Sequence, residues 1–86
     1  MYEKEVQETL DQINMNPKMT NKVNLRGAEV AEVLGCSQAL LNYWRREGLG
    51  PRYIKVPGTG KANNQRCLYP KIEIARWLAQ NLVKTA

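Results

Sequence analysis

The 86-residue sequence contains no histidine and no phenylalanine, and its only cysteines are Cys36 and Cys67. Two cysteines without histidine cannot supply the four ligands of a structural zinc site, and they exclude a cysteine–histidine nucleophile pair. The sequence also lacks an apolar run long enough to span a membrane and has no signal peptide. We therefore expect a cytoplasmic protein without metal or cofactor, whose cysteines are reduced rather than joined in a disulfide.

Acidic charge is scarce in most of the chain, and the formal net charge is +5. Residues 1–25 hold three lysines against four acidic residues, and so carry a net charge of −1. Residues 26–86 hold ten basic residues against four acidic ones, and so carry +6. A basic field concentrated in one part of a chain is typical of nucleic-acid binding, although a basic surface that only keeps a protein soluble is the alternative.

The first 24 residues differ in pattern from the rest. The stretch YEKEVQETLDQIN has apolar residues at helical spacing and acids in its first turns, which predicts a short amphipathic helix. Its apolar face consists of Val6, Leu10 and Ile13. This face either docks onto the rest of the chain or joins copies in a homodimer or a cooperative array.

Residues 14–24 lose the helical periodicity, and Pro17 among several asparagines indicates a linker or an extended arm. Met15 and Met19 are interpreted as linker residues or weak packing residues. We therefore expect an N-terminal helix and linker over residues 1–24, followed by one domain over residues 25–86.

From residue 25 onward the pattern predicts two short helices. The first covers LRGAEVAEVLG and ends at Gly35, where a positive φ angle costs a glycine nothing. Ser37 is a good N-cap for the second, QALLNYWRREG, which Gly48 ends. The residues spaced to pack the helices at a steep angle are Val30, Ala31, Leu34, Cys36, Leu41 and Trp44. This is the packing of a helix-turn-helix, whose second helix enters the DNA major groove.

Two short strands and a last helix follow. Alternation predicts strands over residues 53–56 and 66–69, which a loop rich in Gly, Pro and Asn joins into a hairpin. Pro70 stands where the first residue of a helix is expected, and KIEIARWLAQNLVKT carries that helix nearly to the end. Its expected core face is Ile74, Trp77, Leu78 and Leu82. Trp44 and Trp77 are both expected in the core.

Six residues, most of them polar, lie on the side of the second helix away from its packing face. They are Ser37, Gln38, Ala39, Asn42, Tyr43 and Arg46. Glutamine and asparagine can pair bidentately with an adenine edge, arginine can bind guanine or phosphate, and a tyrosine hydroxyl can hold phosphate. The short Ala39 side chain permits close approach or contacts a thymine methyl. Ordinary solvated side chains are the alternative interpretation of this surface.

The segments GAEVAEVLGCSQALLNYWRREGLGPRYIKV and RCLYPKIEIARWL resemble the excisionase-like and AlpA-like small DNA-binding proteins. The resemblance covers about residues 25–83, and its most specific parts are the YWRREGLGP join and the closing RWL. It implies a MerR-type winged helix-turn-helix, an α+β fold that is mainly α, with two short helices, a β-hairpin wing and a C-terminal helix. Leu40 and the long wing loop depart from the family pattern, and the N-terminal helix or arm has no counterpart in it.

In such a fold the second helix reads the major groove and the wing lies against the backbone or the minor groove. The residues expected to contact DNA are Ser37, Gln38, Ala39, Asn42, Tyr43, Arg45, Arg46, Arg52, Lys55, Lys61 and Arg66. We expect a non-enzymatic protein that binds double-stranded DNA with sequence preference, as a transcription regulator or an excisionase-type recombination directionality factor. The alternatives are a phage DNA-packaging recognition subunit and a protein-interaction adaptor with an incidental basic surface.

Overall fold

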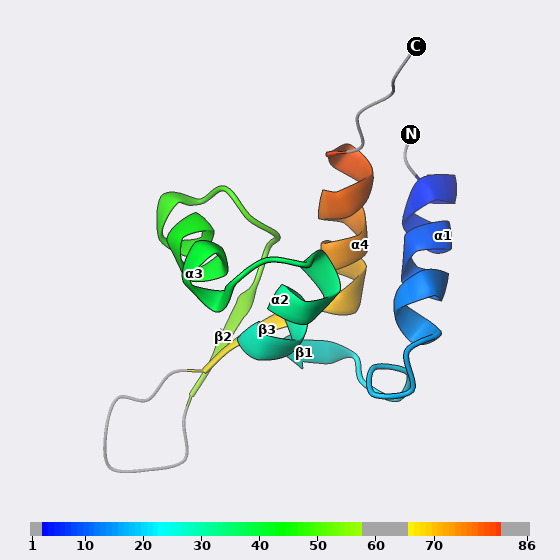
Figure 1. The fold of residues 1–86 in the computed structure, drawn as a ribbon, viewed down its shortest axis with the longest axis horizontal. Helices are drawn as coiled ribbons and strands as arrows, with labels where there is room; N and C mark the ends of the chain where they lie inside the picture. The colour runs from blue at the N-terminus through cyan, green and yellow to red at the C-terminus, as the bar shows by residue number, and fades with distance from the viewer. Residues whose placement is uncertain (1–2, 58–65, 82–86) are drawn as a thin grey trace.

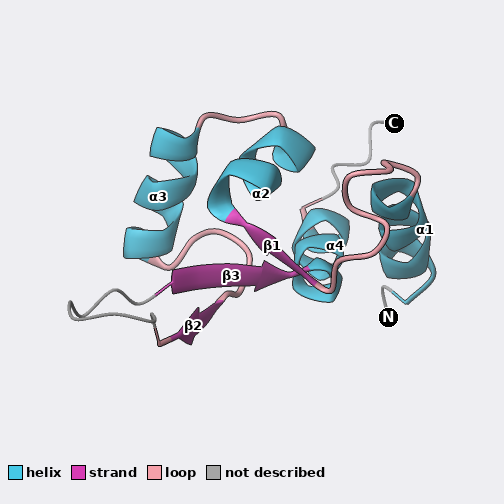
Figure 2. Ribbon diagram, turned by 90° about the horizontal axis from the view of Figure 1, so that it is seen from below, coloured by secondary structure: helices cyan, strands magenta, loops and turns pink. Residues whose placement is uncertain are grey.

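The computed structural model describes residues 3–57 and 66–81. Its elements, in chain order, are α1 (Glu3–Asn14), β1 (Asn24–Arg26), α2 (Gly27–Leu34), α3 (Gln38–Glu47), β2 (Ile54–Val56), β3 (Arg66–Pro70) and α4 (Lys71–Gln80). Helices α2 and α3 lie together over one face of the small sheet, while α1 and α4 stand side by side at its end (Figures 1 and 2). The mainly helical α+β fold expected for a winged helix-turn-helix is confirmed.

The ends of the helix-turn-helix pair are set by residues within the turns. Gly35 and Gly48 follow α2 and α3 in the left-handed region, with φ of 71° and 69°. Ser37 caps α3, because its hydroxyl oxygen accepts a hydrogen bond from the backbone N–H of Leu40 at 3.1 Å. Both predicted helix ends and the predicted N-cap are therefore confirmed, and a single residue, Cys36, separates the glycine from the capping serine.

Strand β1 was not expected, because the sequence predicted that a helix begins at Leu25. The strand pairs antiparallel with β3, and the sheet has the order β1-β3-β2. Leu25 lies opposite Tyr69 and both side chains are buried, so the pairing places one apolar residue of β1 in the core. Helix α2 begins two residues later, where the Glu29 carboxylate accepts a hydrogen bond from the Arg26 backbone N–H at 3.0 Å. The wing hairpin is thus part of a three-stranded sheet.

Helix α1 packs along α4, so the alternative in which its apolar face docks onto its own domain is observed (Figure 1). Ile13 at its C-terminal end is buried in the main core. The interpretation of Met19 as a weak packing residue is wrong: its side chain is fully buried in the same core, within a series of tight turns that follows α1. An apolar side chain placed among asparagines, lysines and threonine still packs when the turns point it inward.

Helix α4 begins one residue later than expected, since Pro70 is its N-cap and Lys71 its first residue. Its buried residues are Lys71, Ile74, Ala75 and Ala79, whereas Leu78 is partly buried and Leu82 lies outside the described residues. Trp44 and Trp77 pack against each other with ring centroids 5.4 Å apart. The Trp77 indole Nε1–H also donates to the Leu49 carbonyl at 3.0 Å. Both indoles are only partly buried, so they form the margin of the core that connects α3 to α4.

Candidate nucleic-acid interface

One side of α3 faces solvent and the other faces the core. Leu41 is 1% exposed and anchors the helix, and Trp44, three residues on, packs against the same core. The residues predicted to lie outside are Gln38, Ala39, Tyr43 and Arg46, which are exposed, and Asn42, which is partly exposed. The predicted outward placement is confirmed, and it gives α3 a continuous surface with two amides, a phenol and a guanidinium. Leu40 is also exposed, beside this surface.

Two predicted site residues, Ser37 and Arg45, also interact with the fold itself. Ser37 uses its oxygen as the acceptor that caps α3, which leaves its O–H free to donate to a ligand. Arg45 lies four residues after Leu41 and therefore on the core-facing stripe of the helix, where it is half-buried. The sequence analysis placed Arg46 on the outer side of the helix and named Arg45 only as a further residue expected to contact DNA, and the two side chains do leave the helix in different directions.

Arg45 and Arg52 meet at the C-terminal end of α3. They line a groove of about 310 Å³ together with Trp44, Gly48, Gly50, Pro51 and Tyr53. The ion pairs among the described residues are Lys22–Glu29 and Arg76–Glu73, so neither arginine of the groove is paired with a carboxylate. Two unneutralised guanidinium groups beside aromatic rings suit a phosphate group.

The wing contributes a further basic residue. Lys55 in β2 is exposed and lies opposite Cys67 in β3, which is two residues from Tyr69 along the strand. Because strand side chains alternate, Lys55 projects from the same face of the sheet as Tyr69, the face that α2 and α3 cover (Figure 2). Arg66 begins β3 opposite Val56. Lys61, the other basic residue predicted for the wing, lies outside the described residues.

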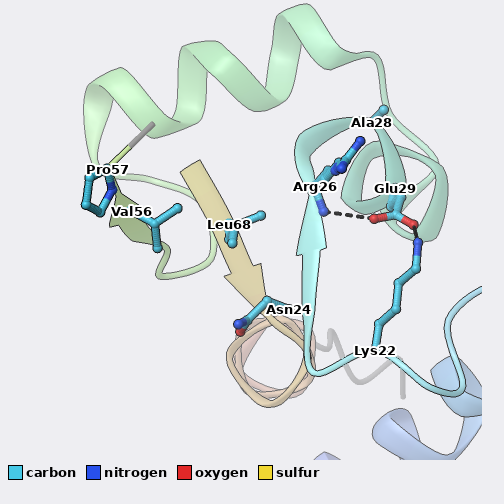
Figure 3. Close-up of a pocket in the computed structure, with 8 residues that line it drawn as sticks. All are labelled: Lys22, Asn24, Arg26, Ala28, Glu29, Val56, Pro57 and Leu68. Atoms are coloured by element: carbon cyan, nitrogen blue, oxygen red, sulfur yellow. Dashed lines mark hydrogen bonds and ion pairs between the residues drawn. The ribbon is translucent and has the colours of Figure 1, made fainter. Parts of the chain in front are cut away.

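The opposite face of the sheet holds a larger groove of about 730 Å³ that the sequence analysis did not identify (Figure 3). Its lining residues are Lys22, Asn24, Arg26, Ala28, Glu29, Val56, Pro57 and Leu68. The pKa of Glu29 is lowered, first by the hydrogen bond from the Arg26 backbone N–H and then by Lys22, which forms an ion pair with it. The alternation in NLR and RCLYP is the signal that predicts this second face. The Glu29 carboxylate in this groove is already paired with Lys22. Of the cations that line the groove, only Arg26 is therefore left to attract an anion.

Helix, glycine turn, capped second helix and hairpin together define a winged helix-turn-helix protein, a class that presents its second helix to DNA. Comparison with protein families matches residues 25–82 to the helix-turn-helix domain family, and the chain belongs to this excisionase-like, DNA-binding family. Its members are typically not enzymes. Comparisons with curated proteins and with solved structures found no match.

Two other expectations concern metal and membrane. No group of three potential metal-ligating side chains occurs within residues 3–57 and 66–81. In that same part of the chain, no helix is both long and apolar enough to cross a bilayer. Cys36 and Cys67 are both free, and Cys36 packs against the core beside the turn between α2 and α3.

Proposed function

We propose that the protein binds double-stranded DNA with sequence preference by placing α3 in the major groove, as a transcription regulator or an excisionase-type recombination directionality factor. The observation that carries the proposal is the solvent-facing side of α3. On this side, the Gln38, Asn42 and Arg46 side chains are not engaged in hydrogen bonds or ion pairs with other described residues. The fully buried Leu41 fixes the opposite side of the helix to the core.

The chemistry of this surface fits base edges. An amide side chain can accept from adenine N6 and donate to adenine N7, and a guanidinium can donate twice to guanine. Ala39 lies between the two amides and has no side chain long enough to hold the helix away from the groove floor. Each good bidentate contact discriminates against a wrong base by about 1–3 kcal/mol.

Selection of bound sites from random duplex DNA tests the sequence preference. Asn42→Ala should then lose about 1–3 kcal/mol of discrimination at one base pair and bind random duplexes nearly as before. Gln80→Ala is the matched control, because Gln80 is an exposed amide at the far end of α4. Equal weakening of selected and random duplexes by Asn42→Ala would show that α3 does not read bases.

The wing should grip the backbone without reading sequence. Lys61→Ala with Arg66→Ala should weaken all duplexes alike and lower the slope of log K against log salt by about 1.8, the value for two lost phosphate contacts. An unchanged slope, with the fold intact by circular dichroism, would place the wing off the DNA. A protein-interaction adaptor would bind no duplex measurably at physiological salt, with or without these residues.

Self-association through Val6, Leu10 and Ile13 stays a prediction. Ile13 is 6% exposed and packs inside its own chain, so any contact between copies has only the remaining, half-exposed part of this face to use. Sedimentation of the intact protein, free and on DNA, measures it. A protein that is monomeric at high concentration in both states would remove the homodimer and the cooperative array through this face.

A further inference from the structure

Among the residues that the structure describes, one buried polar side-chain atom lacks a hydrogen bond of ordinary geometry. Tyr69 is the fourth of the five residues of β3, is 1% exposed, and packs its ring against Tyr53 with centroids 5.8 Å apart. Its hydroxyl is buried, and it is the only such side-chain atom in the described residues without a hydrogen bond. Buried polar groups are nearly always hydrogen-bonded, and an exception calls for a reason.

Arg45 is the charged residue placed to supply the missing bond. It leaves α3 on the stripe that faces the core, four residues after the buried Leu41. Arg45 lines the same groove as Tyr53, and the Tyr53 ring packs against Tyr69 with centroids 5.8 Å apart. In agreement with this proximity, burial raises the pKa of Tyr69 and the Arg45 cation lowers it part of the way back. The Tyr69 hydroxyl has no hydrogen bond of ordinary geometry, although Arg45 lowers its pKa in part as a hydrogen-bond donor, so the two groups are close without a well-formed bond.

The groove that Arg45 lines has an excess of positive charge, which favours binding of an anion. Arg45 and Arg52 bring two positive charges to it, against about half a negative charge from the C-terminal end of α3. Glu47 is two residues after Arg45 and exposed, so it leaves the helix on nearly the opposite side and neutralises neither arginine. The backbone N–H groups of Gly48 and Leu49 bond to carbonyls of the last turn of α3, which lessens repulsion of an anion there.

We propose that this groove is a binding site for a phosphate of the DNA backbone and that Tyr69 is its positioning residue. The inference rests on the proposed function and adds to it a residue that touches no DNA. A guanidinium has five N–H donors in a fixed fork, so Arg45 can donate outward to a phosphate and inward to the Tyr69 hydroxyl at once. The bound phosphate orders the Arg45 side chain, and the Tyr69 hydroxyl holds the guanidinium in the orientation that bonding to the phosphate requires. Lysine, a point charge without a fork, cannot make the same pair of contacts.

Duplex binding by three variants tests this pairing. Tyr69→Phe removes only the unpartnered hydroxyl, so the variant should be as stable as the natural protein or more stable, yet it should bind random and selected duplexes about fivefold or more weakly. Arg45→Ala should lower the slope of log K against log salt by about 0.9, the value for one phosphate. In the Arg45→Ala background, Tyr69→Phe should cause no further loss. Arg45→Lys should keep the salt slope and also abolish the effect of Tyr69→Phe.

A matched control separates this site from the rest of the interface. In an Arg46→Ala background, Tyr69→Phe should keep its full effect, because Arg46 is exposed and leaves α3 about 100° away from Arg45. Unchanged duplex affinity of Tyr69→Phe, or losses that simply add with Arg45→Ala, would overturn the inference and leave the proposed function standing. If the natural protein bound no duplex at all, the proposed function would fail and this inference with it.

Discussion

Lys71 offers the sharpest test of how the N-terminal segment is attached. The residue is 8% exposed, and its ammonium is bonded to three oxygens, one on the last residue of α1 and two in the turns that follow. It donates to the Asn14 side chain, to the Met19 carbonyl at 2.9 Å, and to the Thr20 carbonyl at 3.4 Å. Lys71→Met keeps most of the buried apolar stem and removes all three bonds. We expect this single change to loosen α1 and the turns after it.

The magnitude follows from the environment of each oxygen. Two of the bonds are at full strength, and a hydrogen bond to a charged group contributes about 1.5–3 kcal/mol. The Met19 carbonyl also accepts from the Lys22 backbone N–H, and Asn14 is only partly buried and regains water, so neither oxygen is left unsatisfied. Removing the ammonium also relieves the cost of burying a charge. The net loss is therefore about 2–3 kcal/mol, which lowers the Tm of a domain this size by about 10–20 °C.

Urea denaturation gives this free energy directly, and hydrogen exchange along α1 shows where protection is lost. Lys55→Met is the control, since Lys55 is exposed on β2 and its loss should change stability by less than about 0.5 kcal/mol. Asn14→Ala combined with Lys71→Met should cost less than the sum of the single changes. A Lys71→Met protein as stable as the control would refute the reasoning.

Three further outcomes are expected. Gly35→Ala and Gly48→Ala should each cost about 1 kcal/mol in urea denaturation, because both sites have φ near 70° and open space around a new Cβ. Glu29→Gln should destabilise the protein at neutral pH only. Since the folded-state pKa of Glu29 is lowered, the contribution of this carboxylate to stability is present above its unfolded pKa of about 4.3 and is lost as pH falls through the folded value. Thermal melts of the variant and the natural protein should therefore converge in acid. Trp77→Phe should cost about 1–2 kcal/mol, because it removes the indole bond to Leu49 and part of the ring contact with α3, and an unchanged denaturation midpoint would contradict this.

The sequence predicted the helix-turn-helix well because its signals are local. A glycine at each helix end and a serine N-cap set the boundaries of α2 and α3, and helical periodicity was enough to separate the outer side of α3 from Leu41. The same periodicity, followed one turn further, distinguishes Arg45 from Arg46. Adjacent arginines look alike as composition, but their helical positions differ by 100°.

The parts that the sequence did not predict depend on distant partners. Strand β1 has three residues, too few for a periodic signal, and it is a strand because β3 is there to pair with Leu25. The burial of Met19 and Lys71 likewise depends on two segments that meet only in the folded chain. Local composition describes each segment alone, and tertiary pairing overrides it here.

The contacts that complete the fold also determine which parts of the protein can fold first during synthesis. Both N-terminal elements, α1 and β1, rest on the two C-terminal ones, and the bond between Asn14 and Lys71 spans 57 residues. Contacts between residues so far apart in the sequence form only after the chain has lost the conformational entropy of closing a long loop. A ribosome that has just released α3 has made the whole solvent-facing side of this helix but neither β3 nor α4, which α1 and β1 need for packing. The nascent chain therefore presents its basic helix before it has a finished core to hold that helix in place.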